Sequence, residues 1–328
     1  MDTKQRNRLI YKTCIIFMFC IASFTFLIQN FFEYETGYVF GKQDTINYYI
    51  MLEKPLSYLN DMNHFLVLVL FYYLGFPFVI SYIFIFGGYL LFLIYFRHFF
   101  TPLKSQLAAF ISIFGTSFLA HSLYVAIYSQ TFAFLFFMVM LIGENRKNEA
   151  LEKSVAVLVC ITHGMNAAVV IFYYIMRFVS TKDAQKLKNS MVYIALFFVI
   201  LFASMTNLTG VTPETPISEV TKKAMSISAN IGVNDYEPPY AYVYMVLMNP
   251  TLIGMAANTL NPIYWGFFLA SLLGHNGRIT LYFIPFMVLY AFKRLNNWSG
   301  YSILIISSVA YAYILNYLFI VQTLSNTA

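Results

Sequence analysis

Residues 153–179 read KSVAVLVCITHGMNAAVVIFYYIMRFV, two apolar runs joined by the polar sequence THGMN. Each run is shorter than the roughly 20 apolar residues that a membrane-spanning helix requires. Charged sequences flank the pair, GENRKNEALEK before it and RFVSTKDAQKLK after it. We therefore expect a broken helix pair, 153–163 and 164–179, that meets inside a membrane and leaves both charged flanks on the same side.

The composition extends this interpretation to the whole chain. Of the 328 residues, 60% are hydrophobic and only 10% are charged, whereas soluble domains carry about 25% charged residues. We predict an all-α, polytopic integral membrane protein that forms a single transmembrane domain over 1–328, with about 10 to 11 transmembrane helices, some of them short or broken. The expected spans are 12–31, 77–96, 105–121, 125–142, 153–163, 164–179, 191–207, 242–257, 259–274, 279–292 and 300–321.

Lysine and arginine set the expected orientation, because cytoplasmic connectors are enriched in both. Five segments hold 15 of the 20 basic residues and are assigned to the cytoplasm. These are the N-terminus, 97–104, 143–153, 177–190 and 293–299. Segment 55–74 reads as an interfacial or re-entrant helix rather than a span. Two long outer loops are expected, 33–63 and 208–241.

The motifs of soluble enzymes are missing from the sequence. It contains no glycine-rich phosphate loop, no GxSxG, no HExxH and no Cys/His metal spacing, so neither a cofactor nor a metal is expected. Nucleic-acid binding has no support either, because the basic residues lie in short connectors. The candidate functional residues are polar groups that the predicted topology gathers at the outer face: Gln43, Asp44, Gln130, His163, His275 and Arg278.

Arg278 begins the sequence RITLYFIPFMVLYAF, at the edge of an apolar run. A guanidinium matches phosphate or carboxylate oxygens with two parallel hydrogen bonds, which favours an anion-binding role. The alternative is a helix-end anchor whose charge reaches the membrane interface. Arg278 is the single arginine on the predicted outer face, which favours the functional interpretation.

Two further residues have a local alternative to a functional role. His163 lies at the expected break, where it is a catalytic candidate or a partner of backbone carbonyls freed by the break. Asp44 is a candidate base or a ligand for sugar hydroxyls, but aspartate also favours turns and helix N-caps.

Four segments resemble the EpsG-type, Wzy-like polymerases of bacterial surface polysaccharides, over about residues 30–295. They are GKQDTINYYIMLEKPL at 41–56, YSQTFAFLFF at 128–137, VCITHGMNAAVVIF at 159–172 and GRITLYFIPF at 277–286. The matching positions include Asp44, Gln130, His163, Arg278 and Tyr282. Ser129 stands where the family pattern has arginine, and Gln43 stands where it has a residue close to glycine.

The resemblance implies a membrane glycosyltransferase of the bacterial inner membrane, with a cytoplasmic N-terminus. Such enzymes transfer a glycan from undecaprenyl pyrophosphate to the next lipid-linked repeat unit at the outer face, and they need neither ATP nor a nucleotide sugar. Arg278 would hold the pyrophosphate, with Gln43, Gln130 and Tyr282 in substrate binding, and His163 or Asp44 would be the base. A chain-length regulator and a flippase are the implied protein partners.

Two other classes of function remain open. A transporter or flippase of lipid-linked sugars would favour internal repeats and charges deep in several spans, and neither is evident. A transferase that adds one sugar from a polyprenyl-phosphate carrier would favour an acidic pair in the first outer loop, and Glu33 and Glu35 keep that alternative open. A membrane O-acetyltransferase and a purely structural protein fit the polar outer-face residues less well.

Overall fold

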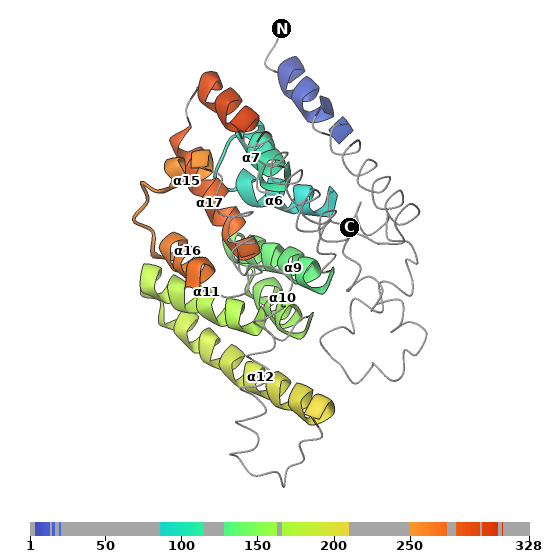
Figure 1. Ribbon diagram of the computed structural model, residues 1–328, viewed down its shortest axis with the longest axis vertical. Helices are drawn as coiled ribbons and strands as arrows, with labels where there is room; N and C mark the ends of the chain where they lie inside the picture. The colour runs from blue at the N-terminus through green and yellow to red at the C-terminus, as the bar shows by residue number, and fades with distance from the viewer. Residues whose placement is uncertain are drawn as a thin grey trace, which may run out of the picture.

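The computed structural model describes a bundle of helices (Figure 1). The described residues are 4–13, 15–16, 20, 86–114, 128–162, 166–209, 250–273, 280–295, 297–307 and 310. Every regular element among them is helical, which confirms the all-α prediction for this part of the chain.

The labelled helices follow the predicted apolar runs, with shifted bounds. They are α6 (Gly88–Arg97), α7 (Pro102–Phe114), α9 (Tyr128–Asn145), α10 (Glu149–Thr162), α11 (Asn166–Thr181), α12 (Ala184–Thr209), α15 (Pro250–Ala256), α16 (Pro262–Leu273) and α17 (Thr280–Arg294). Residues 4–13 and 298–307 are also helical.

Local capping explains why two helices begin inside the charged connectors. The Asp183 Oδ1 atom accepts a hydrogen bond from the Gln185 backbone N–H at 2.9 Å, at the start of α12. The Asn148 Oδ1 atom accepts one from the Leu151 N–H at 3.1 Å, at the start of α10. Both contacts satisfy donors that the first helical turn leaves unpaired. Hydropathy marks where the chain becomes apolar, whereas these caps mark where the helix begins.

Helices α10 and α11 fold back on each other as a hairpin. The Tyr174 hydroxyl donates a hydrogen bond to Glu152 Oε1 at 2.9 Å, although 22 residues separate the two. In one continuous helix those residues would lie about 33 Å apart. The chain therefore reverses between Thr162 and Asn166, which confirms the predicted break between two short helices.

Helix α9 packs closely against α10 because of Gly143. A Cβ atom at this position would lie 3.0 Å from the Glu152 backbone nitrogen and 3.2 Å from its Cα atom. Glycine thus permits the α9 and α10 backbones to approach near the end of α9 and the start of α10.

Helix α17 is the centre of the described core. Its residues from Leu281 to Leu289 are all buried, so its apolar character extends around the whole helix, as expected of a helix with neighbours on every side. It contacts α7, α9, α15 and α16 (Figure 1). Aromatic pairs fill these contacts, including Tyr264 with Phe283 and Phe267 with Phe286, at centroid distances of 5.0 and 5.2 Å.

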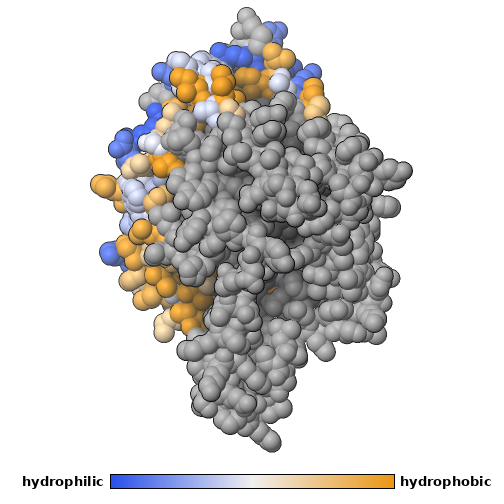
Figure 2. All heavy atoms as spheres, viewed as in Figure 1, coloured by the Kyte–Doolittle hydropathy of each residue, from blue (hydrophilic) through white to orange (hydrophobic). Residues whose placement is uncertain are grey.

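Large apolar side chains also remain on the outside of the helices. Examples of exposed side chains are Leu90, Met191, Val192, Leu269, Ile303 and Ile306. Figure 2 shows hydrophobic residues over much of the described part of one face, interrupted by hydrophilic ones. Within the described ranges, no helix has both the length and the apolarity needed to cross a membrane.

Candidate functional site

The five basic segments identified in the sequence meet at one end of the bundle, which we call the connector end. Arg6 of the N-terminal segment lies over the Trp298 ring, 5.2 Å from its centroid. The Lys104 ammonium donates to the Leu295 carbonyl at 2.7 Å. His98 and Asn145 line one cavity, which joins 97–104 to 143–153. Glu144 pairs with Arg177 and Lys186, which joins 143–153 to 177–190. The structure therefore confirms that these five segments share one end.

Four charged side chains at the connector end form an ion network: Glu144 of α9, Glu152 of α10, Arg177 of α11 and Lys186 of α12. Glu144 Oε1 accepts from Arg177 Nε and from Lys186 Nζ, each at 2.9 Å. Lys186 Nζ also donates to Glu152 Oε1 at 3.0 Å. The network therefore links four helices through charged side chains.

Two neighbouring tyrosines complete the network from α11. The Tyr173 hydroxyl donates to Glu144, and the Tyr174 hydroxyl donates to Glu152. The Tyr174 ring in turn stacks on Tyr193 of α12, with the two planes within 2°. Each buried carboxylate thus receives both an ionic and a neutral donor, as a charge removed from water requires.

The network side chains are buried enough for their pairing to matter. The exposed fractions are 9% for Glu144 and 14% for Lys186. Burial alone would raise the pKa of Glu144, but Arg177, Lys186 and the Tyr173 hydroxyl outweigh it and hold that pKa below its ordinary value. Burial would lower the pKa of Lys186, whereas Glu144 and Glu152 raise it. Both groups are therefore charged at neutral pH.

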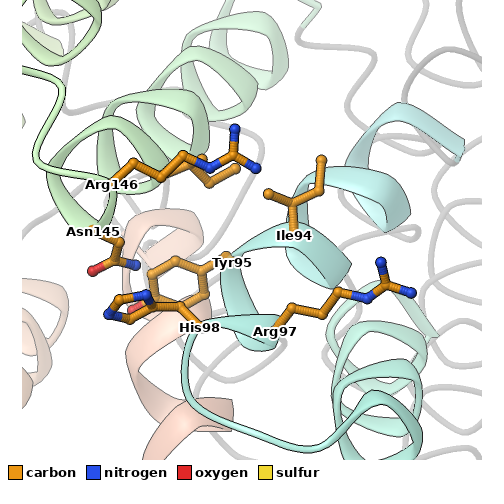
Figure 3. A pocket seen from close by; sticks show the side chains of 7 residues that line it. Ile94, Tyr95, Arg97, His98, Asn145 and Arg146 are labelled. Atoms are coloured by element: carbon orange, nitrogen blue, oxygen red, sulfur yellow. The ribbon is translucent and has the colours of Figure 1, made fainter.

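A second feature of the connector end is a cavity of about 210 Å³ between the last turns of α6 and α9, which we call the basic pocket. Its polar lining consists of Arg97 and His98 on one side and Asn145 and Arg146 on the other. Figure 3 shows Arg146 and Arg97 on either side of Ile94, with the Arg97 guanidinium directed away from His98 and Asn145, which lie beside the Tyr95 ring. The pocket is therefore rich in hydrogen-bond donors.

Away from the connector end, Tyr282 of α17 packs against α9, which also packs against α10. The Tyr282 ring packs edge-on against Phe137 of α9 at a centroid distance of 5.0 Å, and against Phe134 at 5.8 Å. Tyr282 is fully buried, so the described contacts place its ring in the core.

Most of the site residues predicted from the sequence lie outside the described residues. These are Gln43, Asp44, His163, His275 and Arg278. Gln130 lies in the first turn of α9, where the helix backbone is described. Tyr282 is the one predicted site residue whose side-chain contacts are known.

Asn166, the first residue of α11, is a polar group that sequence reasoning did not select. It is 2% exposed, and among the described residues its side-chain amide nitrogen has no hydrogen-bond acceptor. A buried donor without an acceptor costs free energy, about 1–3 kcal/mol in typical proteins. Asn166 lies three residues after His163 in the sequence, so the predicted break carries two polar side chains.

The ion network and the basic pocket were also missed, because the connectors were considered only as an orientation signal. One usable signal was present. Glu144 and Glu152 border opposite apolar runs, whereas the exposed Glu149 lies between them. No comparable signal exists for a metal site, and no group of three or more potential metal ligands occurs among the described residues.

Comparison of the chain with family models, with curated proteins and with solved structures finds no match.

Proposed function

We propose that the protein is a polytopic membrane glycosyltransferase that polymerises lipid-linked oligosaccharide repeat units at the outer face of a bacterial inner membrane. An acceptor hydroxyl oxygen forms a bond to the anomeric carbon of a glycan carried on undecaprenyl pyrophosphate. The bond from that carbon to the pyrophosphate oxygen breaks, and undecaprenyl pyrophosphate leaves. The acceptor proton passes to His163 or Asp44.

The packing of α9 against both α10 and α17 carries this proposal. Gln130 is in the first turn of α9, His163 directly follows the last residue of α10, and Arg278 comes two residues before α17 begins. Helix α9 packs against α10 and, through Phe137 and Tyr282, against α17. Segments that resemble the polymerase family at separate places in the sequence therefore belong to helices that are neighbours.

Arg278 acts on the leaving group. Negative charge grows on the pyrophosphate as its bond to the sugar breaks, and a guanidinium fixed beside it stabilises the transition state more than the ground state. The energy comes from the activated pyrophosphate linkage, so no nucleotide is needed. The buried Asn166 amide, close in sequence to His163, is a further donor for a sugar or phosphate oxygen.

Membrane insertion is supported by the composition and by the surface. The chain is 60% hydrophobic, and large apolar side chains such as Met191 and Ile306 are 65% and 68% exposed. Extended exposed apolar surface is typical of proteins that contact lipid or a partner. The gathering of five basic segments at one end matches the distribution that orients polytopic proteins.

A gel of lipid-linked glycans tests the function in a strain that lacks the gene. The strain is complemented with the wild-type chain, with Arg278→Ala, or with Arg8→Ala, which removes an exposed arginine of the N-terminal segment. Immunoblotting confirms equal amounts of each variant. We expect single repeat units without the gene, a full ladder with wild type and Arg8→Ala, and no ladder with Arg278→Ala.

Two other results would each remove part of the proposal. A ladder that persists in the deletion strain would eliminate polymerase activity and favour the single-sugar transferase. A ladder restored by Arg278→Ala would preserve the polymerase and return Arg278 to the role of a helix-end anchor.

A further inference from the structure

The basic pocket holds cations that other charges in the described structure do not neutralise. Among the described residues, neither Arg97 nor Arg146 forms an ion pair with a carboxylate. The nearest acidic residue in the sequence, Glu144, is bound by Arg177 and Lys186. Because the ion network contains two carboxylates and two cations, it is neutral as a unit. Among the described residues, the network therefore supplies no spare negative charge to compensate Arg97 and Arg146.

The pocket also contains a buried donor without an acceptor. Among the described residues, the side-chain amide nitrogen of Asn145 is buried and has no hydrogen-bond partner. Arginine carries donors and no acceptor, so three of the polar side chains around the cavity present N–H groups. An occupant must therefore offer several acceptor oxygens, and negative charge on them would strengthen each hydrogen bond.

General trends explain part of this arrangement but not all of it. Helix C-termini attract cations, and cytoplasmic connectors are basic in most membrane proteins. Those trends account for the presence of Arg97 and Arg146. They do not account for a cavity between two helix ends, nor for an amide that is buried and unpaired beside it.

We propose that the basic pocket binds a phosphate group, supplied by an anionic lipid headgroup or by a soluble phosphate. Arg97 and Arg146 are exposed, so their side chains can turn to place the guanidinium forks on phosphate oxygens, and the Asn145 amide donates a further hydrogen bond. The cavity of about 210 Å³ is smaller than the roughly 300–1,000 Å³ of pockets for drug-sized ligands, which suits a single phosphate group with a small substituent. This site is separate from the region around Tyr282 and does not depend on the proposed function.

The test uses the full chain, purified in a neutral detergent and a phosphate-free buffer. In one arm, inorganic phosphate is titrated at constant ionic strength while the thermal unfolding midpoint is followed. In the other, the protein is mixed with phosphatidylglycerol, and native mass spectrometry counts the lipids retained. The pocket variant is Arg97→Gln with Arg146→Gln, and the control is Arg8→Gln with Lys188→Gln, which removes the same charge outside the pocket.

At least one probe should bind wild type and control with similar affinity and bind the pocket variant at least tenfold more weakly. Binding of inorganic phosphate alone identifies a soluble ligand, and binding of phosphatidylglycerol alone identifies a lipid. Both arginines are exposed, and an unchanged unfolding midpoint without ligand confirms that the variant folds. Arg97→Lys with Arg146→Lys keeps the charge without the fork and should bind with intermediate affinity.

Two outcomes would overturn the proposal. One is that neither probe binds the wild-type chain. The other is that the pocket variant and the control lose affinity equally, which would mean that general positive charge attracts the anion and that the cavity does not.

Discussion

Two neighbouring regions of the connector end use the same kinds of residue in opposite ways. In the ion network, Arg177 and Lys186 are partly buried and each is paired with a carboxylate. In the basic pocket, Arg97 and Arg146 are exposed and, among the described residues, have no such partner. Glu144 and Arg146 are only two residues apart, yet one contacts α11 and α12 while the other faces α6. A buried charge is paired for stability, whereas an unpaired charge beside a cavity is free to bind a ligand.

The largest expected effect is the loss of Glu144. Glu144→Gln removes the carboxylate that pairs with both Arg177 and Lys186, leaving two partly buried cations with too little negative charge. We expect the free energy of unfolding to fall by about 3 kcal/mol. Denaturant unfolding followed by tryptophan fluorescence would measure it.

Glu149→Gln is the matched control for Glu144→Gln. Glu149 also pairs with a lysine, Lys153, but its side chain is 72% exposed. We expect no measurable change in stability, because solvent screens an exposed pair. Equal losses from the two substitutions would mean that burial does not distinguish them.

The close approach of α9 and α10 gives the second largest effect. Gly143→Ala places a methyl group 3.0 Å from the Glu152 backbone nitrogen, so the α9 and α10 backbones must move apart. We expect destabilisation of about 2 kcal/mol. Gly254→Ala is the control, because no described atom outside its own helical turn lies within 4 Å of its new methyl group. That change should stabilise helix α15 by about 0.5–1 kcal/mol, and opposite signs in the same unfolding assay would confirm the interpretation.

A smaller effect is expected for the tyrosine hydroxyls. Tyr174→Phe removes one donor from the buried Glu152 carboxylate, which keeps its contact with Lys186. We expect a loss of about 1–1.5 kcal/mol. The losses of the two single variants, Tyr174→Phe and Glu152→Gln, should sum to more than the loss measured for the double variant, because the residues share one interaction. Strict additivity would show that the hydroxyl and the carboxylate act separately.

The smallest effect concerns pH. The folded-state pKa of Glu144 lies below its ordinary value of 4.5, so its contribution to stability is complete above pH 4.5 and is lost as the pH falls through the folded-state value. Wild-type stability should decline over that acidic range more than the stability of Glu144→Gln. Parallel pH profiles of the two proteins would show that another group causes the acid sensitivity.

The sequence predicted the helices better than their contacts. Apolar runs identified the labelled helices but not the helical residues 4–13, and the paired basic flanks predicted the reversal between Thr162 and Asn166. Helix starts were shifted because Asn148 and Asp183 cap helices within charged segments, where hydropathy carries no signal. The partners of Glu144 are 33 and 42 residues away in the sequence, and only the arrangement of four helices determines that they meet.

For the functional residues, too, the sequence indicated candidates but not their contacts. Tyr282 was selected by its resemblance to a family pattern, and its described environment is the core contact with Phe134 and Phe137. The substrate-binding role of Tyr282 stays a prediction, as do the roles of Asp44, His163 and Arg278. Neither the basic pocket nor the buried Asn166 amide follows from periodicity, because both depend on how helix ends pack.

Site-directed cysteine labelling in cells tests the central claim that five basic segments share one end of the bundle, on the cytoplasmic side. Single cysteines replace Arg8, Arg97, Arg146, Lys188 or Lys293 in a chain whose three native cysteines are removed, and Ser218→Cys reports on the expected outer loop. With a maleimide that does not cross membranes, we predict labelling of Ser218→Cys alone in intact cells and labelling of all six after permeabilisation. Labelling of some connector positions but not others in intact cells would contradict the account, because it would place the five segments on different sides of the membrane.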